Sequence, residues 1–255
     1  MNRIARGALA AMLMAGVVPA MADATASAQL SNFGLQLIDL DPNDGIAPWI
    51  DLTRLDSHAF AFGGNGAFAA DGTSVFGAVS ADSAGAGTSA TAAISGDLLA
   101  GGVAHADAST LAAYAQAFIN AGTFGMSPTF TLSPHTELVF TGSADVAASI
   151  GAGGGLSEAD VELGLSGPAP DFLFDHDYRS AIAFDGGAHG ASSQGDLSVS
   201  FSNVGDVAVD GTFYVYVMAI ASNVPPVPEP ANWALMLGAM GGLAMALRRR
   251  ARRGD

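Results

Sequence analysis

Carboxylates gather at two places in this sequence with a spacing that could hold a divalent cation. The first group consists of Asp39, Asp41, Asn43 and Asp44. Oxygen ligands at alternate positions before a glycine, here Gly45, are typical of calcium loops. The glycine stands one position later than in an EF-hand loop, and Ile50 takes the place of the bidentate glutamate. The pattern therefore favours a hairpin turn closed by Asp side chains over a calcium site.

The second group is denser and includes a histidine. Asp175, His176 and Asp177 are consecutive, with Asp171 and Asp185 nearby, and together they could ligate a hard or borderline divalent ion. The alternative interpretation is a solvated acidic loop, and the high local charge favours it. We therefore keep Asp175 and Asp177, like the first group, as candidate metal ligands only.

Catalytic chemistry has weaker support in the sequence. Glu137, Glu158 and Glu162 could supply a carboxylate pair for glycoside hydrolysis, but their spacing selects no pair. No Gly-x-Ser-x-Gly elbow is present, and the histidines do not have the His-Glu-x-x-His spacing of zinc hydrolases. The sequence predicts no catalytic residue and no cofactor.

These residues lie in a region of short alternating runs separated by turn residues, which predicts β-strands. The expected strands are 33–40, 57–62, 74–82, 88–95, 129–133, 136–150, 196–203 and 211–222. Gly, Pro, Asp and Asn occupy the segments between them, as in 41–45, 63–66 and 151–155. The spacing predicts an antiparallel β-sandwich of jelly-roll type. The segment 90–121 is expected to be mostly strand, although the alanines of 111–120 have helical propensity.

Composition restricts the partners of this region. Between Asp23 and Pro228 there are two arginines and 22 acidic residues, which give a formal net charge of −20. Nucleic acid is excluded as a partner because phosphate binding needs a basic surface. The chain has no cysteine, so packing alone must hold the core. The charge predicts that calcium raises the melting temperature through weak sites.

Both ends of the chain predict export. Arg3 and Arg6 precede a short apolar run that ends at the small residues Ala20 and Ala22, which is typical of a secretory signal peptide spanning residues 1–22. Cleavage is expected before Asp23, with 26–28 as a second small-x-small site. The body is then expected to span 23–223.

The other end combines three features within 224–255. The triplet Pro228, Glu229, Pro230 precedes an apolar stretch, 231–247, that is just long enough to form a transmembrane helix. Basic residues then predict that the C-terminus stays in the cytoplasm. These residues are Arg248, Arg249, Arg250, Arg252 and Arg253.

Taken together, the string 227–238 and the arginines that follow it resemble a PEP-CTERM sorting signal, over about a tenth of the chain. The resemblance implies that an exosortase cuts near Pro228, Glu229 and Pro230, that Trp233 lies at the membrane interface, and that the arginines form the cytoplasmic stop. It also implies a Gram-negative bacterium that makes exopolysaccharide. The protein would be anchored transiently in the inner membrane before reaching the outer surface or matrix.

The sequence as a whole predicts a non-enzymatic, exported surface or matrix protein with a structural or adhesive role. Signal peptidase and an exosortase would process it, and exopolysaccharide is a candidate partner. A carbohydrate-binding module, with or without calcium, is the first alternative. Trp49 and four tyrosines are few for sugar stacking, and few aromatic residues are expected to be exposed. A glycoside-acting enzyme is the second alternative.

Overall fold

The computed structural model describes residues 24–53, 56–63, 66–74, 77–85, 87–96, 103–109, 112–119, 128–151, 154–167 and 174–223. All of them belong to one compact unit, Met21–Val224. The expected signal peptide with Ala20 and Ala22, and the tail with Pro228, Glu229, Pro230, Trp233 and its arginines, lie outside the described residues. No helix within the described ranges has the length and hydropathy needed to cross a membrane.

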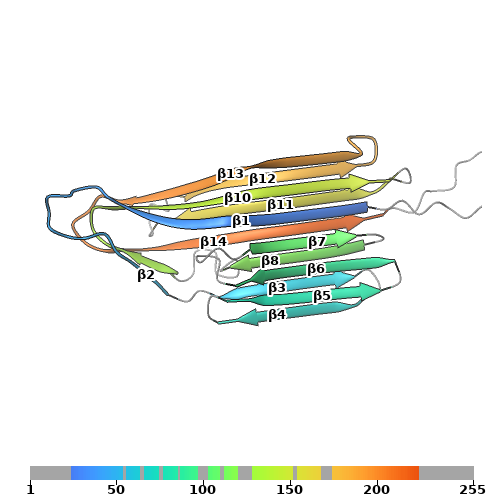
Figure 1. Ribbon diagram of the computed structural model, residues 1–255, viewed down its shortest axis with the longest axis horizontal. Coiled ribbons are helices and arrows are strands. Elements are labelled where there is room, and N and C mark those ends of the chain that lie inside the picture. Colours follow the sequence, from blue (N-terminus) through green and yellow to red (C-terminus); the bar gives the residue numbers. More distant parts are fainter. Residues whose placement is uncertain are drawn as a thin grey trace, which may run out of the picture. The chain divides into compact units, whose positions relative to one another are not determined.

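The described residues form two stacked antiparallel sheets (Figure 1). The six-stranded sheet has the order β13-β10-β1-β7-β6-β5. The eight-stranded sheet has the order β12-β11-β14-β8-β3-β4, and its two remaining strands branch from β14, with β9 paired to β14 and β2 paired to β9. The strands are β1 Ala24–Asp39, β2 Ile50–Leu52, β3 Ser57–Gly63, β4 Phe68–Thr73, β5 Val79–Gly85, β6 Thr88–Ser95, β7 Val103–Ser109, β8 Ala112–Ile119, β9 Phe130–Leu132, β10 Thr136–Ile150, β11 Leu156–Ser166, β12 Phe174–Phe184, β13 Gly190–Asn203 and β14 Val209–Ser222.

The predicted all-β class with antiparallel sheets is confirmed. The expected strands 88–95 and 136–150 match β6 and β10 at both ends. Residues 112–119 form strand β8, so the helical propensity of their alanines does not decide their conformation, because every second side chain of β8 is buried in the sandwich. Two long strands, β11 and β12, were not predicted. The acidic residues of β12 resembled a loop, but Asp175 and Asp177 lie on its inward side, next to the edge strand β13.

Several strands that are consecutive in the chain face each other across the sandwich, whereas others, such as β3 and β4 or β11 and β12, are neighbours in one sheet. The facing pairs include β4 and β5, β7 and β8, β10 and β11, and β12 and β13, while the first and last strands, β1 and β14, also face each other. The chain therefore passes repeatedly from one sheet to the other, and the described N- and C-terminal strands pack together in the middle.

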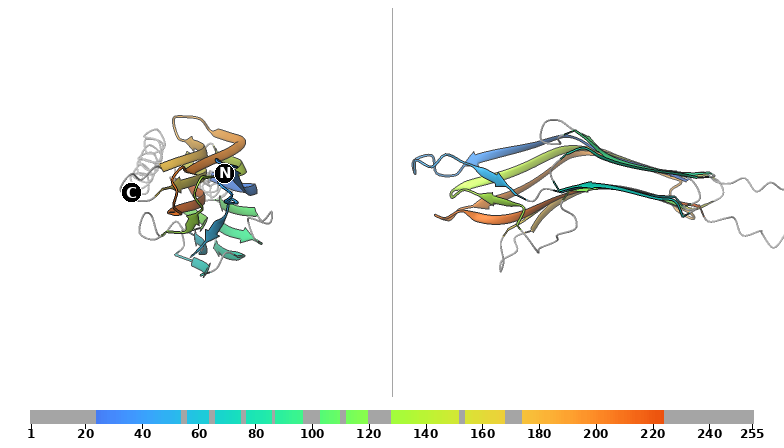
Figure 2. Two further views of the ribbon diagram at one scale, coloured as in Figure 1. Left: turned by 90° about the vertical axis from the view of Figure 1, so that its left-hand side faces the viewer. Right: turned by 90° about the horizontal axis from the view of Figure 1, so that it is seen from below.

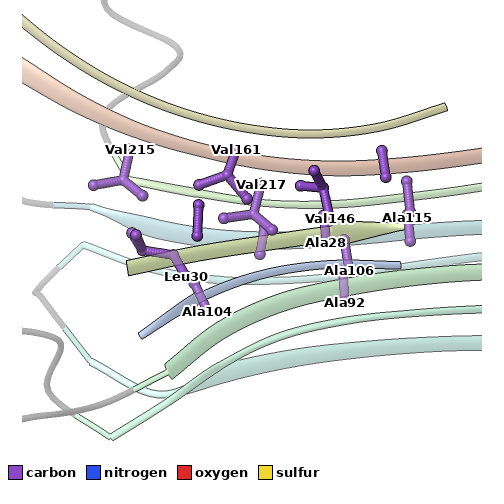
Figure 3. Packing of buried hydrophobic residues seen from close by; sticks show 14 of the residues in the cluster. Ala28, Leu30, Ala92, Ala104, Ala106, Ala115, Val146, Val161, Val215 and Val217 are labelled. Carbon is purple, nitrogen blue, oxygen red and sulfur yellow. The ribbon is translucent and has the colours of Figure 1, made fainter. Parts of the chain in front are cut away.

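Core side chains change in size along the strands. At the end where β1 begins, the inward positions are alanines, as in the row formed by Ala26, Ala108 and Ala148. At the end where β1 finishes, the core contains stacked phenylalanines, with the rings of Phe140 and Phe213 centred 4.7 Å apart. The two sheets accordingly diverge toward the end that carries the β1–β2 connection (Figure 2). The small side chains between the sheets are seen from close by in Figure 3.

A hydrogen bond between the sheets shows how closely they approach at the alanine end. The hydroxyl of Ser157, on the inward face of β11, donates to the backbone carbonyl of Thr25 on β1. Both Ser157 and Ala159 beside it are fully buried. A short side chain can reach the opposite backbone only because alanines keep the sheets close, so this end has little room for larger residues.

Both lateral edges of the six-stranded sheet are covered by side chains from the facing sheet. Asp177 Oδ2 accepts a hydrogen bond of 3.1 Å from the backbone N–H of Ser198 on the edge strand β13, and Asp175 Oδ2 accepts one of 2.8 Å from Ser200 N–H. Arg179 donates to the carbonyl of Asp196 at 2.7 Å. Inward-pointing charged residues of this kind protect an edge strand from pairing with another chain.

The opposite edge uses the same chemistry. Asp71 on β4 accepts a hydrogen bond of 3.0 Å from the backbone N–H of Ser80 on edge strand β5. Asp175 and Asp177 are thus neither members of an acidic loop, as the sequence suggested, nor arranged around a common point. They lie on one side of strand β12, and one oxygen of each accepts a hydrogen bond from a backbone amide of β13.

Candidate functional site

The two outward faces of the sandwich differ sharply in chemistry. On the six-stranded sheet, the outward positions carry mainly hydroxyl, amide and carboxylate side chains, and among these described positions no phenylalanine, tyrosine or tryptophan occurs. Examples are Ser192, Gln194, Asp196, Ser198, Ser200 and Ser202, which alternate along β13.

The outward face of the eight-stranded sheet contains all four tyrosines of the chain and six of its 14 phenylalanines. We call this surface the aromatic face. Its aromatic and imidazole residues are His58, Phe60 and Phe62 on β3, Phe68 on β4, Tyr114 and Phe118 on β8, Phe174, His176, Tyr178 and Phe184 on β12, and Tyr214 and Tyr216 on β14.

Strand alternation places these residues on one side, because side chains at i and i+2 point to the same face. The strand register then aligns them across the sheet. Tyr178, Glu162, Tyr216, Phe118 and His58 occupy one row over β12, β11, β14, β8 and β3. With about 5 Å between neighbouring strands, this row is roughly 20 Å long.

One group of rings lies on β3, β8 and β4. The His58 and Phe118 rings stack with centroids 5.1 Å apart, and Phe60 stacks on Phe118 at 5.5 Å. Phe68 extends the group, with its centroid 6.1 Å from that of Phe60. Phe68 is 64% exposed although its neighbours are partly covered, so the group presents an open apolar edge to solvent.

A second group follows β12. Phe174, His176 and Tyr178 stack one after another, with centroid distances of 5.2 Å and 6.1 Å. The ring of Tyr214 continues the stack from β14, 6.3 Å from Phe174. Phe174 and Tyr178 are 51% and 57% exposed. Their exposure shows that these rings do not belong to the core, and they form a continuous aromatic column on an edge strand.

Glycine allows one of these rings to lie flat on the sheet. Gly164 stands beside Tyr214 in the register, and a Cβ added to it would lie 2.1 Å from a carbon of the Tyr214 ring. Only glycine leaves room for this contact. The ring covers the bare backbone of β11, and its hydroxyl donates a hydrogen bond to Glu162.

Three carboxylates lie between the two aromatic groups, on the outward face of β11. We call Glu158, Asp160 and Glu162 the acidic column. Burial raises the pKa of Glu158, and the charge of Asp160 and a hydrogen bond to it raise it further. Burial also raises the pKa of Tyr214, and the hydrogen bond to Glu162 adds to the shift. The column is thus a crowded strip of negative charge bordered by apolar rings.

This arrangement is chemically suited to sugar rings. Aromatic faces bind the C–H faces of pyranoses, while carboxylates accept hydrogen bonds from hydroxyls or amines. The sequence-based expectation that exposed aromatic residues are few is wrong for the folded body, since Phe62, Phe68, Phe174, Tyr178 and Phe184 are all exposed. Counting tryptophans and tyrosines missed the face because phenylalanines make up half of its twelve rings.

The candidate calcium residues of the β1–β2 connection form the turns expected as the alternative. Asp39 accepts a hydrogen bond from the Asp41 N–H at 3.0 Å, and Asp41 accepts one from Asn43 N–H at 3.2 Å. Asp44 likewise accepts one of 2.6 Å from the N–H of Ile46. Each aspartate therefore has a local structural role. Asn43 contributes its backbone to this series.

The fold adds a histidine that the sequence did not connect with this group. His135, in the β9–β10 turn, places Nδ1 2.7 Å from Asp44 Oδ2 and Nε2 3.1 Å from Asp206 Oδ1. Ligand atoms of Asp41, Asp44 and His135 lie within 4.8 Å of one another. An imidazole nitrogen suits borderline metals better than calcium, so His135 makes this group a poorer calcium site than the aspartates alone would suggest.

An ion pair accounts for the same geometry. The Asp44 carboxylate raises the pKa of His135 through a hydrogen bond, and the charges of Asp44, Asp206 and Asp41 act in the same direction. The hydrogen bond to His135 in turn lowers the pKa of Asp44. His135 has a positive φ of 46°, so the turn holds its ring between carboxylates from two other connections.

The three glutamates considered for glycoside hydrolysis do not come together. Glu137 lies on the outward face of β10 in the six-stranded sheet, opposite to the face of β11 that carries Glu158 and Glu162. Glu158 and Glu162 are four residues apart on one strand, about 13 Å. Neither combination has the separation of a retaining or an inverting pair, roughly 5 to 9.5 Å.

A shallow hollow of about 300 Å³ lies on the outward face of the six-stranded sheet, over β1, β6, β7 and β10. Hydroxyls that already bond each other line it, with 2.6 Å between Ser89 and Ser109 and 2.7 Å between Thr25 and Ser149. Asp107 is its charged residue, and burial raises the pKa of that carboxyl, opposed by His105. The hollow offers polar contacts but no ring to stack on.

Comparison with known proteins adds no assignment to this geometry: no protein-family model, curated protein or solved structure matches the chain.

Proposed function

We propose that this protein is an exported surface or matrix protein whose body adheres to polysaccharide through the aromatic face. The observation that carries the proposal is the segregation of rings. All four tyrosines and six phenylalanines lie on the outward side of one sheet, while the corresponding side of the other sheet carries hydroxyls. Five of these ten rings, Phe62, Phe68, Phe174, Tyr178 and Phe184, are exposed to solvent, and a face with this many exposed rings is typical of an interaction site.

The dimensions of the face suit a chain-like ligand better than a small molecule. The aromatic residues are spread over five of the six strands in the main path of the sheet, and the row from Tyr178 to His58 is roughly 20 Å long. An extended polymer can contact several rings in succession, and many weak stacking contacts then combine. This is the behaviour expected of an adhesive protein.

Sorting is the second part of the proposal. The signal peptide, with Ala20 and Ala22 before its cleavage site, would direct export. A transmembrane helix at 231–247 would hold the chain in the inner membrane. An exosortase would then act near Pro228, Glu229 and Pro230, and the arginines from 248 would remain in the cytoplasm.

The strand pairing supports signal cleavage before Asp23 rather than after Ala28. Residues 25–30 of β1 pair with β10 on one side and with β7 on the other. Ala24, Ala26 and Ala28 are buried in the core. Cleavage after Ala28 would remove the first residues of this central strand, whereas cleavage before Asp23 leaves the strand complete.

The jelly-roll connectivity is also proposed. Its support is the repeated crossing between sheets, in which several consecutive strands face each other and the first and last strands lie together. In rolled sandwiches of this kind, an outward sheet face is a common place for glycan binding.

The test is binding of the purified full chain, in mild detergent, to a panel of immobilised neutral, cationic and anionic polysaccharides. We expect saturable binding to at least one polysaccharide. Replacing Phe174, His176 and Tyr178 with serine should reduce the affinity at least tenfold, because stacking contacts are lost.

The matched control replaces Val103, His105 and Val139, on the outward face of the six-stranded sheet, with serine. It removes two apolar side chains and one imidazole from the opposite face without touching the aromatic face. Equal loss of binding in both variants, or no binding by the unmodified protein, would contradict the proposed function.

A further inference from the structure

Apart from the histidines His58 and His176, the ionisable groups of the aromatic face are acidic or phenolic. The acidic column runs through its middle, and neither lysine nor arginine occurs at its described outward positions. Arg179, the one arginine of the described residues, lies on the other side of β12, where it bonds Asp177 and the backbone of β13. A ligand that lies across the two aromatic groups must therefore cross the acidic column, which in the row from Tyr178 to Phe118 is represented by Glu162.

We infer that the polysaccharide recognised by the aromatic face is a cationic amino-sugar polymer, in which free amines lie over the acidic column while the pyranose rings stack on Tyr178, Phe118 and their neighbours. This inference rests on the proposed function and names the ligand class for the same face.

Charge complementarity selects this class. An anionic polysaccharide would bring carboxylate or sulfate groups toward Glu158, Asp160 and Glu162 on a body of net charge −20, and repulsion would oppose it. A neutral polymer would stack and could donate hydroxyl hydrogen bonds to the carboxylates, but it would bring no positive charge to offset theirs. An ammonium group can pair with a carboxylate and also interact favourably with the aromatic faces beside it.

The state of the acidic column supports the same ligand. The carboxylates are crowded in this strip. Desolvation and the charge of Asp160 therefore raise the pKa of Glu158, because both disfavour its ionised form. A cation placed over the strip relieves that repulsion and favours the ionised form. Glu162 is oriented toward the neighbouring strand by the hydroxyl of Tyr214, which links the column to the stacked rings.

The same charges disfavour other occupants of the face. Two copies of the body placed face to face would bring their acidic columns together, and each copy has a net charge of −20. An anionic lipid surface would also repel the column. A cationic polymer is the partner that gains from both the rings and the carboxylates.

The test uses two oligosaccharides with the same backbone: a hexamer of β-1,4-linked glucosamine, whose amines are free, and its N-acetylated counterpart, which is neutral. Titration calorimetry of the full chain at pH 6 should give at least about tenfold tighter binding of the glucosamine hexamer. The variant Glu158→Gln, Asp160→Asn, Glu162→Gln should bind both hexamers equally, at the affinity of the unmodified protein for the neutral one.

The matched control removes three carboxylates from the other outward face: Asp82→Asn, Glu137→Gln and Asp145→Asn. It has the same net charge as the first variant and should keep the preference for the glucosamine hexamer. Melting curves check that both variants are folded.

The outcomes separate the inference from the proposed function. Equal loss of preference in both triple variants would show general attraction to an acidic body and would overturn the inference. Stronger binding of the neutral hexamer, or of an oligogalacturonate, would also overturn it while leaving polysaccharide adhesion intact. Binding of none of these sugars, and of no polysaccharide in the wider panel, would overturn both.

Discussion

Asp177 on β12 accepts a hydrogen bond of 3.1 Å through Oδ2 from the backbone N–H of Ser198 on β13, across the lateral edge of the sandwich. Asp175 makes the equivalent contact with Ser200. An aspartate side chain here takes the place of a neighbouring strand. The edge of the six-stranded sheet is satisfied without offering its backbone amides to another molecule.

Removing these two carboxylates should make the protein self-associate. The variant Asp175→Ala, Asp177→Ala leaves the amides of Ser198 and Ser200 open to pairing with a second chain, and it should cost about 1 kcal/mol per contact in the free energy of unfolding. Light scattering after size-exclusion chromatography should detect dimers or larger species.

The matched control for this variant is Asp82→Ala, Asp145→Ala, which changes the net charge equally. Among the hydrogen bonds of the described residues, Asp145 accepts one from the side chain of Gln194, and neither aspartate accepts one from a backbone amide. The control should remain as monodisperse as the unmodified protein. If it associates to the same extent, reduced charge and not the exposed edge is responsible.

Leucine should not be tolerated at the narrow, alanine-rich end of the core. Ala92 is 1% exposed and faces inward on β6, whereas Ala93 beside it faces outward. Ala92→Leu should lower the free energy of unfolding by about 1–3 kcal/mol because the extra atoms force the sheets apart. Ala93→Leu should change it by no more than about 0.5 kcal/mol.

Urea unfolding monitored by circular dichroism measures both values. The comparison is direct because the two alanines are neighbours on one strand and receive the same side chain. Equal values for the two variants would contradict the close approach of the sheets at this end.

The His135–Asp44 pair should make stability depend on pH on both sides of neutrality. Because the folded-state pKa of His135 is raised above its ordinary value of 6.5, its contribution is complete below that pH and is lost as the pH rises through the higher folded-state value. The pKa of Asp44 is lowered, so the contribution of Asp44 to stability is complete above its ordinary value of 3.8. That contribution is lost as the pH falls through the lower folded-state value.

Thermal melts between pH 3 and pH 9 should therefore show a fall in melting temperature above pH 6.5 that is absent from His135→Asn. Asparagine is the chosen replacement because it tolerates the positive φ of this position. A variant whose alkaline profile matches that of the unmodified protein would show that the pair does not contribute to stability.

Glu229→Ala should block removal of the C-terminal tail. From the sequence, the two prolines around Glu229 are expected to favour an extended segment suited to a protease, in which the carboxylate is the one charged group of the triplet. Intact-mass spectrometry of the protein produced in a host with an exosortase should find the tail retained. Asn232→Ala, three residues further along, should be processed normally; normal processing of Glu229→Ala would rule the prediction out.

Local sequence was sufficient for much of the fold. The alternation in 88–95 and 136–150 predicted strands with the observed ends, because a strand with one buried face has a period of two in its side chains. The aspartates from Asp39 to Asp44 predicted turns closed by their own side chains, since those hydrogen bonds join residues only two apart.

The candidate binding face depended on contacts that local sequence does not contain. Strand β14 is apolar on both sides, with Phe213 and Val215 buried in the core and Tyr216 on the outward face. Periodicity shows that alternate residues share a face, but not which face meets the other sheet. Only the packing of the two sheets decided that the tyrosines point outward.

Long-range pairing likewise decided the roles of the charged residues. His135 meets Asp44 from 91 positions away, and Asp177 meets the backbone of Ser198 on the other sheet. The sequence by itself determined several of the strands, the aspartate-closed turns and the acidic charge, because each depends on neighbouring residues. For the same reason it predicts the two terminal signals, which stay predictions. The tertiary structure decided which side chains share a surface, because strand order and register join segments whose separation along the chain leaves no local pattern.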